Sequence, residues 1–81
     1  MNLSVEISMY PLAEDYIPPI QGFIDELNRH PALTVLTNTM STQVFGPYDE
    51  VMAVLAAAMK AEHAKGKASF VCKFLGGDLR P

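Results

Sequence analysis

The strongest constraint on the fold is a strict alternation of apolar and polar side chains near the N-terminus. The apolar members are Leu3, Val5, Ile7 and Met9, and the members between and after them are Ser4, Glu6, Ser8 and Tyr10. A period of two residues is typical of a β-strand that buries one face and leaves the other accessible. Pro11 lacks a backbone N–H group and ends the pattern. We therefore expect a strand over residues 3–10, in a sheet with one covered face.

Two later segments follow the period of an α-helix. The first, residues 18–29, begins with two prolines, which suit a first helical turn, and carries the apolar stripe Ile20, Phe23, Ile24 and Leu27. The second, residues 48–65, is rich in alanine and carries the stripe Tyr48, Val51, Met52, Leu55 and Met59. Gly66 follows the second segment, where a glycine commonly terminates a helix in the left-handed conformation.

Three further strands complete the pattern, over residues 33–39, 42–46 and 68–75. The order β-α-β-β-α-β is that of the split βαβ, or ferredoxin-like, arrangement. We therefore predict an α+β fold in which two helices cover one face of a four-stranded antiparallel sheet, ordered fourth, first, third, second. A chain of 81 residues has room for one small core, so we expect a single domain over residues 1–81.

The alternation also predicts which side chains of the last strand face the helices. Phe70, Cys72 and Phe74 are expected on the covered face, and Val71, Lys73 and Leu75 on the open face. Cys72 is the only cysteine and stands in an apolar run, so we expect a buried thiol. A small domain with an open sheet face often covers that face with a second copy, so we expect a homo-oligomer, either a dimer or a tetramer.

Charge and hydropathy exclude two classes of partner. The formal net charge is −3, and the few basic residues form no face that could neutralise a phosphate backbone, so we expect no nucleic-acid partner. No apolar run approaches the roughly 20 residues that span a bilayer, and the N-terminal residues do not resemble a leader, so we expect no membrane partner and a cytoplasmic location.

Residues with catalytic or metal-binding chemistry are sparse. His30 and His63 stand at the ends of the two predicted helices, far from Ser41 in this topology, so no nucleophile, base and acid converge. No set of His, Cys, Asp and Glu has the spacing of metal ligands. The loop after the first strand offers acids and prolines where a phosphate site would need glycines or basic residues. We therefore expect no enzyme, no metal and no cofactor.

Two features remain that have both a structural and a functional interpretation. In the segment NTMSTQVFG, residues 38–46, three hydroxyl side chains surround Met40, and hydroxyls near a hairpin either form the turn or line a site. Glu6 lies on a central strand, where a carboxylate is costly unless it is paired. It either forms a cross-strand pair with Lys73 or accepts a hydrogen bond from a ligand. The pattern alone leaves both questions open.

The segments VEISMYPL, residues 5–12, and NTMSTQVFGPYDEVMAVL, residues 38–55, resemble the YkoF-like family of ferredoxin-like thiamine-binding domains. The resemblance covers nearly the whole chain, and MSTQVFG is its most specific part. It implies a non-catalytic pocket for thiamine or its hydroxymethylpyrimidine moiety, in an assembly of two or more copies. The ring of such a ligand needs polar partners and flat walls. The candidate partners are Ser41, Thr42, Ser8 and Glu6, and the candidate walls are Tyr10, Met40 and Phe45.

The leading functional hypothesis is therefore a small-molecule binding protein for thiamine or hydroxymethylpyrimidine, in thiamine salvage or transport. The alternative is a ligand-free oligomerisation or regulatory module. In that case Ser41 and Thr42 only hold the hairpin, and Glu6 only pairs with Lys73.

Overall fold

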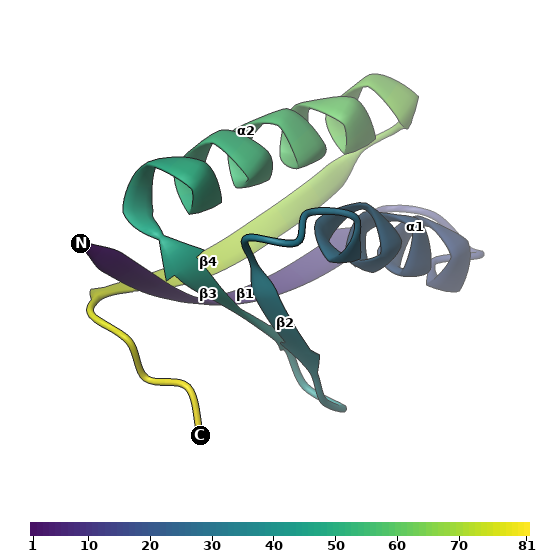
Figure 1. The fold of residues 1–81 in the computed structure, drawn as a ribbon. Helices are drawn as coiled ribbons and strands as arrows, with labels where there is room; N and C mark the ends of the chain where they lie inside the picture. Colours follow the sequence, from purple (N-terminus) through teal and green to yellow (C-terminus); the bar gives the residue numbers. More distant parts are fainter.

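The computed structural model describes the whole chain, Met1–Pro81, and contains six elements in two layers. These are β1 (Asn2–Pro11), α1 (Ile17–Asn28), β2 (Thr34–Thr37), β3 (Thr42–Pro47), α2 (Tyr48–Lys65) and β4 (Ala68–Gly76). The strands form one antiparallel sheet in the order β2-β3-β1-β4. Both helices lie on the same side of this sheet (Figure 1). The predicted α+β, ferredoxin-like fold and its strand order are thus confirmed.

The core lies between the helices and the covered face of the sheet. The alternation on β1 directs its apolar side chains there, where burial of apolar surface is the main stabilising contribution. Ten buried side chains form the core: Leu3, Val5, Ile7, Phe23, Leu27, Leu33, Val44, Val51, Leu55 and Ala58.

The helices lie close to their predicted positions, with two corrections. Pro18 and Pro19 occupy the first turn of α1, where a missing N–H group leaves no hydrogen bond unmade. On α2, Tyr48 and Met52 are 40% and 38% exposed, so their assignment to the buried stripe was wrong. Gly66 ends α2 as predicted, but with a φ of 175°, an extended conformation open to any residue, instead of the left-handed one. Neither helix combines the length and the apolar composition that crossing a bilayer requires.

The hairpin between β2 and β3 differs from the prediction, because β2 ends at Thr37 instead of Thr39. The side chain of Asn38 forms the turn: its Oδ1 accepts hydrogen bonds from the backbone N–H groups of Met40 and Ser41, each over 3.0 Å. The backbone N–H of Asn38 also donates to the carbonyl of Ser41 over 3.0 Å. An Asn side chain that bonds to its own turn is a common turn former. The chain therefore leaves the sheet at Asn38 and returns at Thr42.

The edge strand β4 is less buried than predicted. Cys72 packs against the core but is only half-buried, because β4 has a neighbour on one side alone. Phe74 pairs with Val5 and so belongs to the covered face, yet it is 49% exposed. On the open face, the Nζ of Lys73 lies 3.5 Å from the Oε1 of Glu6, which confirms the predicted cross-strand pair.

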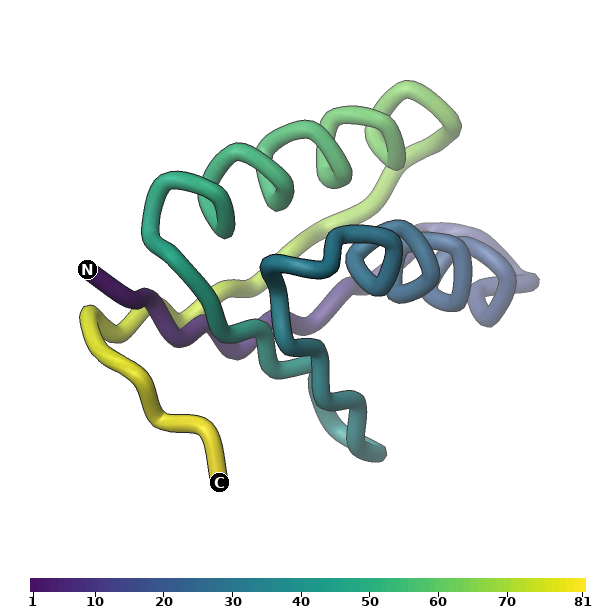
Figure 2. Tube along the Cα trace, in the orientation of Figure 1, coloured from purple at the N-terminus to yellow at the C-terminus, as the bar shows by residue number.

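The C-terminal residues, Gly77–Pro81, run along the sheet face opposite the helices (Figures 1 and 2). Ser4 holds them: its Oγ donates to the carbonyl of Gly77 over 2.7 Å and accepts from the backbone N–H of Leu79 over 2.9 Å. Part of the face that was expected to be open is therefore covered by the chain itself. Phe45 is only 4% exposed on that face and lines a cavity together with Leu79.

Candidate functional site

The candidate site begins where β1 continues beyond β3. The ladder between β1 and β3 ends at the pair Ile7 and Thr42, whereas the ladder between β1 and β4 continues to Pro11 and Ala68. The edge of β1 over residues 8–11 therefore has no strand beside it on the β3 side. Backbone N–H and C=O groups on such an edge need other hydrogen-bond partners.

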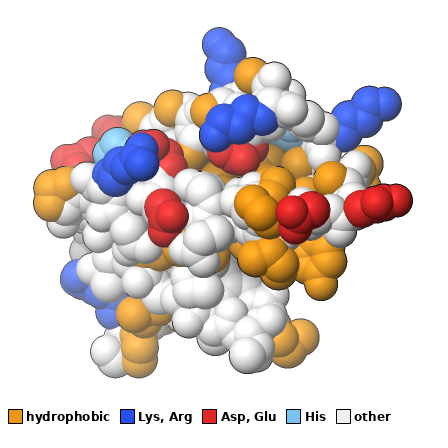
Figure 3. Space-filling view, turned by 90° about the vertical axis from the view of Figure 1, so that its right-hand side faces the viewer, with side chains coloured by type: hydrophobic (Ala, Val, Ile, Leu, Met, Phe, Trp, Pro, Cys, Tyr) orange, Lys and Arg blue, Asp and Glu red, His pale blue; other side chains and the backbone are white.

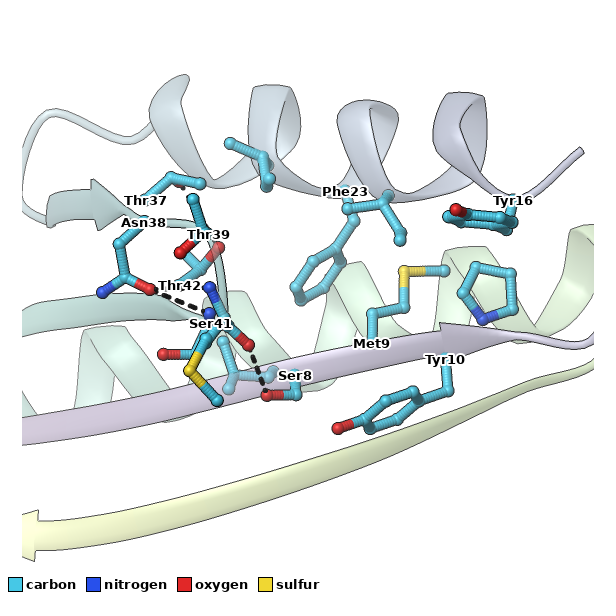
Figure 4. Close-up of a pocket in the computed structure, with 15 residues that line it drawn as sticks. Ser8, Met9, Tyr10, Tyr16, Phe23, Thr37, Asn38, Thr39, Ser41 and Thr42 are labelled. Carbon is cyan, nitrogen blue, oxygen red and sulfur yellow. Dashed lines mark hydrogen bonds between the residues drawn. The ribbon is translucent and has the colours of Figure 1, made fainter.

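A cavity of about 350 Å³ lies against this open edge (Figure 4). Its apolar side is formed by Met9 and by side chains at the start of α1 and along it, namely Tyr16, Ile20, Phe23 and Ile24. Its polar side is formed by Ser8 and by the end of the β2–β3 hairpin, namely Thr37, Asn38, Thr39, Ser41 and Thr42. Figure 4 shows the turn at one end of the cavity, Tyr16 at the other, and Phe23 between them.

The hydroxyls on the polar side are already partly engaged. The Oγ of Ser41 donates to the Oε2 of Glu6 over 3.0 Å, and the Oγ of Ser8 contacts the carbonyl of Met40 over 3.4 Å. The hydroxyls of Thr37 and Thr42 lie 3.4 Å apart. Every residue that lines the cavity carries an uncharged side chain. The arrangement therefore suits a neutral, flat group with hydrogen-bonding atoms on one edge.

Five of the seven predicted site residues line this cavity: Ser8, Tyr10, Met40, Ser41 and Thr42. Two of them, Met40 and Tyr10, were predicted as walls of the pocket but are largely exposed to solvent. The side chain of Met40 is 87% exposed at the turn. Tyr10 projects from the opposite side of β1 to Met9 and Phe23, as Figure 4 shows, and is 55% exposed.

Glu6 and Phe45 do not line the cavity, so the seven predicted residues do not all meet in one pocket. They lie on the opposite face of the sheet and line a second cavity of about 280 Å³, together with Gln43, Lys73 and Leu79. The reason is the period of the strand, which directs Thr42 to the helices and Gln43 and Phe45 away from them. Glu6 still reaches the first cavity indirectly, through its hydrogen bond with Ser41.

The apolar side chains of α1 and Asn38 were not among the predicted site residues. Ile20, Phe23 and Ile24 were interpreted as core alone, because periodicity identifies a buried stripe without showing where it extends past the sheet. Tyr16 stands in a loop and gave no signal. Asn38 was open to prediction, since Asn is a frequent turn former.

The loop that contributes Tyr16 to the cavity also exposes apolar side chains. Leu12, Tyr16 and Ile17 are 69%, 53% and 59% exposed, in and after the loop that leads from β1 into α1. Figure 3 faces this end of the molecule and shows hydrophobic side chains gathered there, with acidic side chains beside them. An exposed apolar cluster rimmed by polar groups often marks a binding surface.

Comparison with known proteins identifies the family. The family model described as the YKOF-related family matches residues 2–74. The chain belongs to this family. No curated protein matches this member of the YKOF-related family.

Solved structures share the fold of this YKOF-related protein. Protein SP2199 from Streptococcus pneumoniae is 22% identical with a TM-score of 0.87, and the match covers 98% of this chain and 90% of that one. The hypothetical protein MJ1052 from Methanocaldococcus jannaschii is 19% identical with a TM-score of 0.81, over 99% and 84% of the two chains. Protein TM0486 from Thermotoga maritima, whose name suggests thiamine biosynthesis or salvage, is 16% identical with a TM-score of 0.82, over 99% and 85%.

Proposed function

We propose that this YKOF-related protein is a cytoplasmic, non-catalytic binding protein for thiamine or its hydroxymethylpyrimidine moiety, with a role in thiamine salvage or transport. The observation that carries the proposal is the cavity beside the open edge of β1, which is apolar along α1 and polar along the hairpin. Membership of the YKOF-related family and the name of the Thermotoga maritima neighbour support it.

The chemistry of an aminopyrimidine fits the two sides of the cavity. The ring has two apolar faces, which Phe23 and Tyr16 can contact as they contact any flat aromatic group. Its edge carries an amine and ring nitrogens, which the hydroxyls of Ser41 and Thr42 and the backbone edge of β1 can meet. A volume of about 350 Å³ falls in the range of small-molecule pockets, about 300–1,000 Å³.

The charge of intact thiamine also agrees with this placement. Its thiazolium ring is cationic, and the loop that contributes Tyr16 to the cavity also carries Glu14 and Asp15. A pyrimidine ring inside the uncharged cavity would leave the thiazolium near these acids, where opposite charges attract. The formal net charge of −3 favours the approach of a cation as well.

Titration calorimetry with thiamine, with hydroxymethylpyrimidine and with the isolated thiazole alcohol tests the proposal. We expect saturable binding of the first two and none of the thiazole. Amide chemical shifts in a ¹⁵N spectrum should change at Ser8–Tyr10 and in the hairpin, and stay unchanged on the outer side of α2. Absence of a saturable signal at millimolar pyrimidine would exclude the proposed function.

A second candidate, an oligomerisation or regulatory module without a ligand, is favoured by a different observation. Leu36, Val71 and Leu75 are 39%, 59% and 45% exposed on the face of the sheet away from the helices. We propose that copies of the chain associate as a dimer or tetramer through this face, because association removes such side chains from water. Sedimentation velocity of Val71→Lys should show smaller particles than the unmodified protein. Unchanged thiamine binding in this variant would separate assembly from the pocket.

A further inference from the structure

One hydrogen bond links the candidate pocket to the other face of the sheet. Ser41 lines the cavity, and its Oγ donates over 3.0 Å to the Oε2 of Glu6, which lies outside the cavity. A carboxylate can only accept, so the single hydrogen of the Ser41 hydroxyl is used in this bond. The Oγ of Ser41 can therefore only accept a hydrogen bond from a ligand, through a lone pair.

The position of Glu6 is held by the sheet and not by the hairpin turn. Glu6 is on the central strand β1, opposite Gln43 on β3 and Lys73 on β4. Its second carboxylate oxygen, Oε1, lies 3.5 Å from the Nζ of Lys73. The acceptor that Ser41 meets is therefore placed by two ladders of backbone hydrogen bonds.

Several other polar groups at this end of the cavity already use their hydrogens within the protein. The backbone N–H groups of Met40 and Ser41 both donate to Asn38 Oδ1, and the hydroxyl of Ser8 donates to the carbonyl of Met40 over 3.4 Å. Thr37 and Thr42 share one hydrogen bond, so one of their two hydroxyl hydrogens stays free. The side-chain N–H groups of Asn38, the hydroxyl of Thr39 and one hydrogen of the threonine pair remain as donors, whereas Ser41 Oγ itself offers an acceptor.

We infer that Glu6 is a positioning residue that determines ligand specificity by holding Ser41 as a hydrogen-bond acceptor. The site then selects a heterocycle that presents an amine to Ser41 over the same ring with a carbonyl in that place. The inference rests on the proposed pyrimidine site, and it adds the choice between amino and oxo rings. A carbonyl facing Ser41 Oγ would leave two acceptors without a hydrogen between them, which is costly in a desolvated site.

The test compares the dissociation constants of two ligands, 4-amino-5-hydroxymethyl-2-methylpyrimidine and its 4-oxo counterpart. We expect the unmodified protein to prefer the amino ring by about tenfold or more. In Glu6→Gln the side-chain amide can donate to Ser41 and free its hydrogen, so the preference should fall to about threefold or less. Lys73→Met is the matched control, since it removes the partner of Glu6 on the open face and should leave the preference unchanged.

If Glu6 had a purely structural role, Glu6→Gln would weaken the binding of both ligands equally and leave the ratio of their dissociation constants unchanged. This ratio is therefore the decisive quantity. If Glu6→Gln fails to fold, Ser41→Ala replaces it, and the preference should again fall to about threefold or less. Equal affinity for the two rings in the unmodified protein, or an unchanged ratio in the variant, would overturn the inference and leave pyrimidine binding intact. Binding of neither ring would overturn both the inference and the proposed function.

Discussion

Ile7 and Thr42 form the last pair of the ladder between β1 and β3, and both line the cavity that opens beyond this pair. Both side chains are buried, Ile7 at 2% and Thr42 at 6% exposure. Beyond this pair the hairpin turns away and β1 continues alone on that side to Pro11. The register of β1 and β3 thus leaves an open backbone edge on β1, and apolar side chains of α1 cover it (Figure 4).

Replacing Thr42 with Val should weaken thiamine binding with little change in stability. The two side chains have nearly the same shape, and the only partner lost is the hydroxyl of Thr37, which is exposed and can bond to water. We expect a loss of about threefold to tenfold in affinity, the worth of one hydrogen bond. Calorimetry measures the affinity and thermal unfolding measures Tm. A lower Tm with unchanged affinity would mean that Thr42 serves the hairpin alone.

Replacing Tyr16 with Ala should remove part of the apolar wall. Tyr16 lines the cavity and is 53% exposed, so its replacement should change the stability of the fold little. The ligand would lose one aromatic contact. We expect at least a threefold loss of affinity for hydroxymethylpyrimidine, in line with about 0.5–1.5 kcal/mol for an aromatic pair. Tyr48→Ala is the matched control, because Tyr48 is 40% exposed and lies outside the cavity. Equal effects of the two substitutions would count against the proposed wall.

Replacing Ser4 with Ala should release the C-terminal residues from the sheet. The Oγ of Ser4 is hydrogen-bonded to both Gly77 and Leu79, and its loss removes both of these hydrogen bonds. We expect a destabilisation of about 1–3 kcal/mol in urea unfolding and faster hydrogen exchange at the amide of Leu79. Ser69→Ala is a suitable control, since Ser69 is exposed on β4. Unchanged exchange at Leu79 would contradict the role of Ser4.

Cys72 should make stability depend on pH in the alkaline range. Partial burial raises the pKa of the Cys72 thiol above its ordinary value, because the thiolate is disfavoured away from water. The folded state therefore binds the thiol proton more tightly than the unfolded state does. This contribution is fully present below the pKa of the unfolded thiol, about 8.5, and is lost as the pH rises through the folded pKa.

Urea unfolding of the protein and of Cys72→Ala between pH 7 and pH 10 measures this effect. We expect stability to fall more steeply with pH in the unmodified protein than in the variant. Thiol reagents should react more slowly with the folded protein than with the unfolded chain at pH 8. Parallel stability profiles for the two proteins would argue against a shifted thiol.

The candidate site was only half open to prediction from the sequence. Ser41 and Thr42 stood out in the hydroxyl cluster of the hairpin, and Ser8 was a candidate partner under the family resemblance; the structure brings these three to one cavity. Phe23 did not stand out, because a residue in an apolar stripe looks the same whether it faces the core or a cavity beside it. Glu6 stood out for its cost on a central strand, but its face of the sheet removed it from the lining.

The local pattern determined the elements, their order and the buried face of β1, because a period of two or 3.6 residues is a property of neighbouring side chains. Membership of the YKOF-related family also lies in the sequence. Only the tertiary structure decided that β1 extends beyond the end of its ladder with β3 at Ile7, and that α1 covers the open edge of β1 that results. It also decided that the C-terminal residues, Gly77–Pro81, cover part of the open face of the sheet. These are contacts between segments distant in the chain, and no local period encodes where one strand stops against another.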